Sequence, residues 1–189
     1  MLIYMRVRHG TRSYEIVDTV MSKLYPNRAD LVVVDLTYGV GRFYRLARRR
    51  IRQLIAVDIE KYRWEVKPDM FYQIPCQLFV EKVLKNEIVL PSTNLVVVDP
   101  PWSNEKRGKA PSDVGISSLP YHIRYVDSRS ITVYAMRLAN HLGTPLLYRY
   151  YEPLSCEHIA KVEVLVNIMK HRGVVYYGVC RPSTWGQRI

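Results

Sequence analysis

Short apolar runs alternate along the chain with segments of helical periodicity. The runs at 31–34, 54–57 and 95–98 are continuous and rich in β-branched residues. Runs of this kind are typical of strands that are covered on both faces in a parallel sheet. In the segments between and after them, apolar positions recur at helical spacing at 13–24, 78–84 and 130–141. The pattern therefore predicts strands that alternate with helices.

Shorter or less regular segments add further strands to this prediction. We expect strands at 70–74 and 145–151. Apolar runs at 162–168 and 174–179, separated by a glycine-containing turn, predict an antiparallel hairpin near the end of the chain. Strand–helix alternation followed by such a hairpin indicates an α/β fold with a doubly wound, Rossmann-like sheet. The sheet should be mostly parallel, with the hairpin making its edge mixed.

The predicted helices differ in how clearly the sequence marks their ends. Ser13 is a plausible N-cap of the first helix, and Tyr25-Pro26-Asn27 should end it. An arginine-rich helix is expected at 42–50 and a short one near 156–160. Residues 61–68 are too few and too broken in pattern for a full crossover helix.

Length and pattern together predict one domain. A chain of 189 residues can bury a full core without disulfides or metal. No internal repeat or interdomain linker stands out, so we expect a single domain over 1–189, with 1–29 as an N-terminal helical extension that starts as irregular chain or a short strand. The polar stretch 103–127 is long for a loop inside a compact domain, and such loops are commonly functional.

The charge balance points to a polyanionic partner. The chain carries 28 Lys and Arg against 17 Asp and Glu, a net charge of +11. A basic domain of this size favours nucleic acid as that partner, with a generally basic composition as the alternative. The three cysteines are far apart, and the histidines show no metal spacing, so neither a disulfide framework nor a metal site is indicated. With no signal peptide and no apolar run near 18 residues, we expect a cytoplasmic protein.

A glycine-bearing turn follows the first buried run. Asp35-Leu-Thr-Tyr-Gly-Val-Gly41 lies directly between a predicted strand and a predicted helix. Glycines two apart let the backbone approach a ligand closely, and the helix start offers free N–H groups. Asp58 ends the next strand, where an acid can accept hydrogen bonds from ribose hydroxyls. These features favour an adenosine-containing cofactor. A tight turn with a helix-capping aspartate is the structural alternative.

The chemistry of that cofactor can be narrowed. The dinucleotide fingerprint requires a third glycine, but bulky Tyr44 stands there. Asp35 offers an anion where the amino group of a methionine moiety would need one. Both points favour S-adenosylmethionine over NAD.

A third motif follows the run at 95–98. Asp99-Pro100-Pro101-Trp102 places a carboxylate, a carbonyl and a flat aromatic ring at the end of a buried strand. The amine on a nucleobase ring is a poor nucleophile because its lone pair is conjugated. Hydrogen bonds to Asp99 and to the Pro100 carbonyl would turn that lone pair toward an electrophilic methyl group, while Trp102 stacks on the base. A partly buried tryptophan at a proline-rich strand exit is the alternative.

In this order and spacing the three motifs resemble class I S-adenosylmethionine-dependent methyltransferases, and more narrowly those with a D-P-P-W motif that modify exocyclic amines of nucleobases. The resemblance implies that the cofactor is S-adenosyl-L-methionine. Tryptophan in the last place of the motif is most similar to the enzymes that modify the N6 amine of adenine, which implies this amine as the target. It implies a catalytic motif of Asp99, Pro100, Pro101 and Trp102. The cofactor-binding residues that it implies are Asp35, Thr37, Tyr38, Gly39, Gly41 and Asp58.

The substrate is less well marked than the reaction. Lys106, Arg107 and Lys109 follow the catalytic motif and are candidates for gripping DNA or RNA. The six arginines between 42 and 52 form either a phosphate-contacting face or a solvated helix face. No acid follows 70–74 to contact the cofactor's adenine, and His9-Gly10-Thr11 is either a lid over the cofactor or a surface turn.

Three functions remain open on the sequence. The first is methylation of a nucleobase amine in DNA or RNA, with a homodimer or an accessory specificity subunit as partner. The second is methylation of a protein amide or a small molecule by the same fold. The third is a non-catalytic, Rossmann-like nucleic-acid-binding module.

Overall fold

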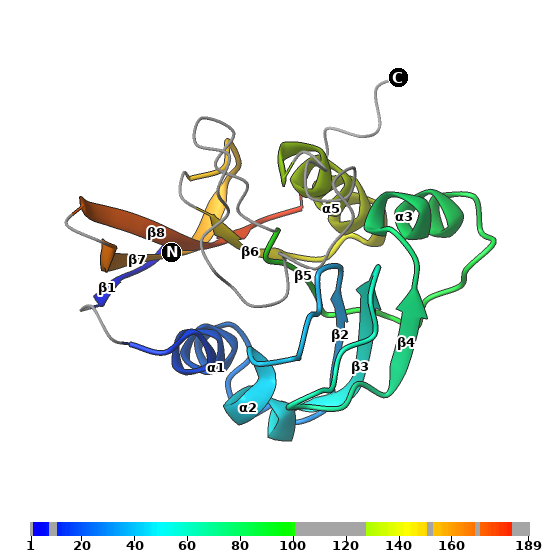
Figure 1. Cartoon of the computed structure of the whole chain (residues 1–189), viewed down its shortest axis with the longest axis horizontal. Helices are drawn as coiled ribbons and strands as arrows, with labels where there is room; N and C mark the ends of the chain where they lie inside the picture. Colours follow the sequence, from blue (N-terminus) through cyan, green and yellow to red (C-terminus); the bar gives the residue numbers. More distant parts are fainter. Residues whose placement is uncertain (1, 8–10, 101–127, 151–152, 169–170, 183–189) are drawn as a thin grey trace.

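The computed structural model describes residues 2–7, 11–100, 128–150, 153–168 and 171–182. Within these ranges eight strands form one sheet, in the order β1-β7-β8-β6-β5-β2-β3-β4 (Figure 1). The strands are β1 (Ile3–Val7), β2 (Leu31–Asp35), β3 (Ile51–Asp58), β4 (Met70–Gln73), β5 (Leu95–Val98), β6 (Leu146–Tyr150), β7 (His158–Ile168) and β8 (His171–Cys180). The helices are α1 (Ser13–Leu24), α2 (Tyr44–Ala47), η1 (Arg48–Arg50), α3 (Cys76–Leu84) and α5 (Ser128–Leu142).

The central part of the sheet is parallel, as the apolar runs predict. Strands β4, β3, β2, β5 and β6 pair in parallel, and β8 is antiparallel to both β6 and β7. The predicted fold class is therefore confirmed. The hairpin does not form the edge of the sheet, however, because β1 adds in parallel to the outer side of β7.

Side chains that alternate along the strands build a core on each face of the sheet. On β2, Leu31 and Val33 pack with α1, while Val32 and Val34 pack with α3 and α5. All five β2 residues are buried. The helices accordingly lie in two layers, with α1 and α2 on one face and α3 and α5 on the other (Figure 1). None of the described helices is long and apolar enough to cross a membrane.

Three helix predictions need correction. The expected helix at 42–50 is one α-helical turn, α2, followed by the 3₁₀ turn η1, since β3 already begins at Ile51. No helix forms near 156–160, because His158 and Ala160 already pair with β8. Ser13 is the first residue of α1 and Arg12 is its N-cap, whose backbone N–H donates to Glu15 Oε2 at 2.8 Å.

A disulfide joins Cys156 to Cys180, contrary to the expectation of unpaired cysteines. The two residues are 24 apart in sequence, and their Cα atoms lie 5.7 Å apart. They meet because β7 and β8 are antiparallel, which places the start of β7 beside the end of β8. His158 lies against the pair, and its Nε2 is 2.6 Å from Tyr148 Oη. The predicted hairpin, extended to the starts and ends of its strands, therefore brings this cluster together.

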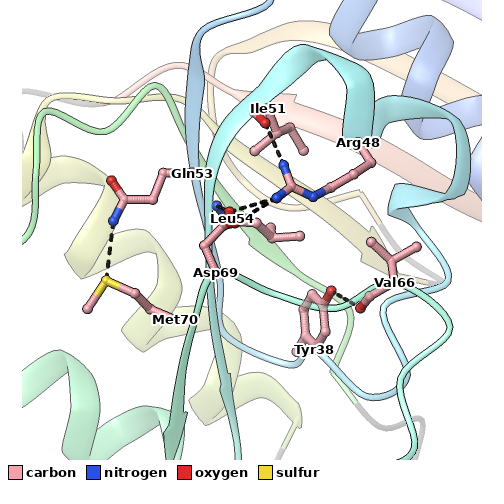
Figure 2. A network of polar contacts seen from close by, with 8 residues as sticks. All are labelled: Tyr38, Arg48, Ile51, Gln53, Leu54, Val66, Asp69 and Met70. Atoms are coloured by element: carbon pink, nitrogen blue, oxygen red, sulfur yellow. Dashed lines mark hydrogen bonds and ion pairs between the residues drawn. The ribbon is translucent and has the colours of Figure 1, made fainter.

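An ordered loop replaces the crossover helix between β3 and β4, as the sequence predicts. Figure 2 shows how polar contacts hold it. Arg48 donates to both carboxylate oxygens of Asp69, at 2.7 and 2.9 Å, and Asp69 also accepts from the Leu54 backbone N–H at 2.7 Å. Tyr38 Oη donates to the Val66 carbonyl at 2.6 Å. The loop is thereby tied to β3 and to the turn that follows β2.

Candidate functional site

Three aspartates end three adjacent parallel strands. Asp35, Asp58 and Asp99 come at or directly after the ends of β2, β3 and β5, which lie side by side in the sheet. Because the carboxyl ends of parallel strands meet at one edge, the three residues gather there, where ligands bind in open α/β sheets. One residue of each predicted motif, Asp35, Asp58 and Asp99, therefore lies at this edge.

Hydrogen bonds join the glycine turn to both neighbouring strand ends. The Gly39 N–H donates to Asp58 Oδ2 at 2.7 Å, and the Tyr38 N–H donates to the Val57 carbonyl at 3.2 Å. On the other side the Asp99 N–H donates to Thr37 Oγ1 at 2.7 Å. The turn thus fixes the relative positions of Asp58 and Asp99.

The two glycines of the turn have different surroundings. Both have positive φ, 56° at Gly39 and 77° at Gly41. A Cβ on Gly41 would lie 2.5 Å from Tyr38 Oη and 2.7 Å from the Val66 carbonyl oxygen. At Gly39 no described atom would lie within 4 Å of an added Cβ. Gly41 is therefore required by packing, whereas the Gly39 backbone is open to an approaching ligand.

Asp35 is buried inside the turn, with 3% of its surface exposed. Its Oδ1 accepts from the Thr37 N–H at 2.9 Å, and its Oδ2 accepts from Tyr44 Oη at 2.7 Å. Burial raises the pKa of Asp35 to about 7, and the nearby carboxylates of Asp99 and Asp58 add to that shift. Any ligand contact with Asp35 therefore has to reach a nearly enclosed group.

Asp58 is also engaged by the backbone. Besides the Gly39 N–H, it accepts from the Glu60 N–H at 3.2 Å. Burial raises the pKa of Asp58 above its ordinary value. The site thus concentrates carboxylates in a partly dry environment, which favours a positively charged ligand.

Two residues of the candidate site were not identified from the sequence. Tyr44, taken only as a bulky side chain in place of a glycine, holds the Asp35 carboxylate and is fully buried. Arg149 on β6 lies 3.0 Å from Asp99 Oδ2, and its guanidinium stands over the Tyr177 ring. The register of β5 and β6 explains the position of Arg149. It pairs Val98 with Tyr148, so that the residues that follow them, Asp99 and Arg149, lie side by side.

The rest of the predicted catalytic motif is only partly described. Pro100 is buried directly after Asp99. Pro101, Trp102, Lys106, Arg107, Lys109 and the predicted substrate loop 103–127 lie outside the described residues, as do His9 and Gly10.

Most of the arginines between 42 and 52 form ion pairs with acidic residues of neighbouring segments. Arg49 and Arg50 pair with Asp18 on α1, at 3.0 and 3.4 Å, and Arg48 pairs with Asp69. Arg42 and Arg45 share Glu65, at 3.0 and 2.6 Å. Most of this charge holds the short helix to its neighbours.

Comparison with known proteins bears on the fold. No protein-family model matches the sequence, and no curated protein matches it. Among solved structures, the chain is similar to the N-methyltransferase NodS from Bradyrhizobium japonicum, with a TM-score of 0.54, 10% identity, and 92% of this chain and 99% of that chain covered. It is also similar to an rRNA methylase from Streptococcus thermophilus, with a TM-score of 0.50, 9% identity, and again 92% and 99% covered. The chain therefore has the fold of these methyltransferases.

Proposed function

We propose that this protein is an S-adenosylmethionine-dependent methyltransferase that modifies an exocyclic amine of a nucleobase in DNA or RNA, with the N6 amine of adenine as the first choice. The observation that carries the proposal is the hydrogen-bonded group of Asp58, the 35–41 turn and Asp99 at the carboxyl edge of the sheet. Its members follow the motifs that the sequence shares with such enzymes, on a fold that methyltransferases use.

The turn and the two acids beside it suit the proposed cofactor. S-adenosylmethionine supplies an electrophilic methyl group on a sulfonium when bound. The open backbone at Gly39 allows close approach, and Asp58 stands where a ribose would need an acceptor. Asp35 and Asp58 lie beside the turn, and a bound cationic group would favour the charged form of each carboxylate. Thr37, Tyr38 and Gly41 shape the turn, and Asp35 holds it from inside through the Thr37 N–H.

Asp99 and Pro100 are the proposed acceptor side. The Asp99 carboxylate accepts a hydrogen bond from the target amine, and the Pro100 carbonyl accepts the other. In this geometry the nitrogen lone pair would face the methyl group that a bound cofactor would supply, and the proton that the nitrogen loses on methylation would pass to solvent. Arg149 contacts Asp99 Oδ2 at 3.0 Å and thereby orients the carboxylate, which has acceptor capacity beyond one ion pair. Pro101 and Trp102 are proposed to frame and stack on the base.

The net charge of +11 favours nucleic acid over a protein amide or a small molecule as substrate. A protein amide or a small molecule as substrate, and a non-catalytic binding module, are the competing functions. A cytoplasmic location and a homodimer or accessory subunit stay predictions.

Two measurements test the proposal. Calorimetry should detect binding of S-adenosylmethionine and of its demethylated product; absence of both would exclude the enzyme. Transfer of a labelled methyl group to a panel of DNA, tRNA, rRNA and protein, followed by mass analysis of the modified nucleosides, should identify an N-methylated base. Label found only in protein would establish the second function instead.

The acceptor side has its own test. Asp99→Ala removes the carboxylate that accepts the hydrogen bond of the target amine, so we expect methyl transfer to fall about 10- to 100-fold with cofactor affinity largely kept. The matched control is Asp30→Ala, at an exposed aspartate paired with Arg28 away from the site, which should transfer at the wild-type rate. Wild-type transfer by Asp99→Ala would exclude the proposed role.

A further inference from the structure

A hollow of about 600 Å³ lies between the start of α1, the start of α2 and the strands β6, β7 and β8. Val164 on β7 and Val175 on β8 form part of its apolar wall. Its polar wall includes Arg12, Tyr14, Arg42, Arg45, Arg149 and Tyr177, and its described lining contains no acidic residue.

The charge of this hollow is strongly positive. Four guanidinium groups line it, and two carboxylates contact them: Glu65 is shared by Arg42 and Arg45, and Asp99 pairs with Arg149. Arg42 and Arg45 keep 57% and 46% of their side chains exposed. Partly exposed guanidinium forks that converge on a concave surface match the geometry of phosphate oxygens.

Aromatic rings hold two of these arginines in place. The Arg45 guanidinium stands 5.4 Å from the centroid of the Tyr14 ring, and that of Arg149 stands 5.7 Å from the Tyr177 ring. Tyr177 is itself buried and packs against Phe43 at a centroid distance of 6.1 Å. Stacking of this kind orders a guanidinium before a ligand arrives, which lowers the entropy lost on binding.

Arg149 connects the hollow to the proposed acceptor site. It lines the hollow and contacts Asp99 Oδ2 at 3.0 Å. A DNA or RNA strand whose target base lies at Asp99 would therefore have its sugar-phosphate backbone in the hollow. A volume of this size accommodates a nucleotide-sized group and not only a single ion.

We propose that this hollow binds the phosphodiester backbone beside the target nucleotide, with Arg12, Arg42 and Arg45 contacting phosphate oxygens and Arg149 linking the backbone to the acceptor site. The inference rests on the proposed function for the meaning of Asp99. It assigns nucleic-acid contact to a surface that combines the N-terminal helix, α2 and the C-terminal hairpin.

The test measures binding of a labelled, unstructured single-stranded oligonucleotide to the full chain at several salt concentrations. Arg12→Gln and Arg42→Gln should each weaken binding about tenfold at low salt. The slope of log affinity against log salt should fall by about 0.7 for each arginine removed. The matched control is Arg52→Gln. Arg52 is exposed and lies near the start of β3, at the opposite end of the strand from Asp58, so this variant should keep the wild-type slope.

Further measurements separate the possible results. Thermal melting must show that the variants are folded, and calorimetry with S-adenosylmethionine should give the wild-type affinity for Arg12→Gln. If the wild-type chain binds no cofactor, the proposed function fails. The oligonucleotide measurements still test whether the hollow binds a nucleic-acid backbone. Unchanged slopes in both variants, or an equal loss in Arg52→Gln, would overturn the inference. So would displacement of the oligonucleotide by polyglutamate of equal charge, which would indicate an acidic peptide as the ligand.

Discussion

Individual side chains at the site show that position in the fold, more than residue type, decides their chemistry. Asp35 and Asp99 both follow buried strands, yet Asp35 is enclosed by Thr37 and Tyr44 while Asp99 meets Arg149. Burial raises the pKa of Asp35, whereas the Asp99 carboxylate lies 3.0 Å from the Arg149 guanidinium. One carboxylate therefore holds the turn, and the other is available for the acceptor.

The raised pKa of Asp35 predicts a pH-dependent stability. An ordinary aspartate in the unfolded chain has a pKa of about 3.9, against about 7 in the folded protein. The folded state therefore binds the proton more tightly, and stability falls as pH rises from about 4 to about 7, by up to about 4 kcal/mol. Urea unfolding from pH 5 to pH 8 should show this fall in the wild type, and the difference between wild type and Asp35→Asn should change across the same window. Parallel profiles would contradict it.

Alanine at the two glycines of the turn should have different main effects, on stability at position 41 and on cofactor binding at position 39. An alanine at position 41 meets Tyr38 and the Val66 carbonyl, so Gly41→Ala should lower the free energy of unfolding by about 2–4 kcal/mol, from strain and overlap together. Gly39→Ala carries only the strain, about 1–2 kcal/mol, but its methyl group occupies the open approach to the turn. Urea unfolding should rank Gly41→Ala as the less stable variant. Calorimetry should show that Gly39→Ala weakens cofactor binding at temperatures where it is folded.

At the scale of elements, ion pairs hold segments in place where helices are short or absent. The 59–69 loop has no helix to pack, and Arg48 and Asp69 anchor it to η1 and β3 instead. The loop in turn meets the glycine turn through the Glu65 N–H, which donates to the Val40 carbonyl at 2.8 Å, and through Tyr38. The geometry of the site therefore depends on contacts outside it.

Removal of the Asp69 carboxylate should loosen this anchor. Asp69→Ala leaves the Leu54 N–H without its acceptor and leaves the Arg48 guanidinium with only the Ile51 carbonyl, so we expect a loss of about 2–3 kcal/mol in the free energy of unfolding, measured in urea. Asp30→Ala removes an exposed partner of Arg28 and should leave stability nearly unchanged. Equal effects of the two substitutions would show that the Asp69 contacts contribute no more than a surface pair.

The elements that the sequence predicts well are those whose signal is local. The runs Leu31–Val34 and Leu95–Val98 form buried strands because continuous β-branched residues suit a sheet covered on both faces. The helix at 42–50 is overestimated because its periodicity carries no information about where β3 begins. The Cys156–Cys180 pair lies across the predicted hairpin but needs the exact extent of its two strands. The contact of Arg149 with Asp99 depends on which strands become neighbours, and that order is set by the whole chain. The same holds for β1, whose partner lies near the other end of the sequence.

At the scale of the whole molecule, the disulfide connects the start of β7 to the end of β8. It closes a loop of 24 residues, so its removal should cost about 2–4 kcal/mol of stability. Urea unfolding with and without a thiol reductant should show this loss in the wild type. The double variant Cys156→Ser with Cys180→Ser should be less stable and insensitive to reductant. A wild-type protein equally stable in both conditions would show that the bond contributes nothing.

The pairing of β1 with β7 has a consequence for synthesis on the ribosome. Ile3 pairs with Ala160 and Val7 with Val164, so the first strand has no partner until most of the chain has been translated. At ordinary elongation rates that wait lasts roughly 10–30 s. During it the apolar side chains of Ile3, Met5 and Val7, which pack against the core in the finished fold, remain in water. Nascent chains arrested before β7 should therefore be the form of this protein that a chaperone holds most tightly.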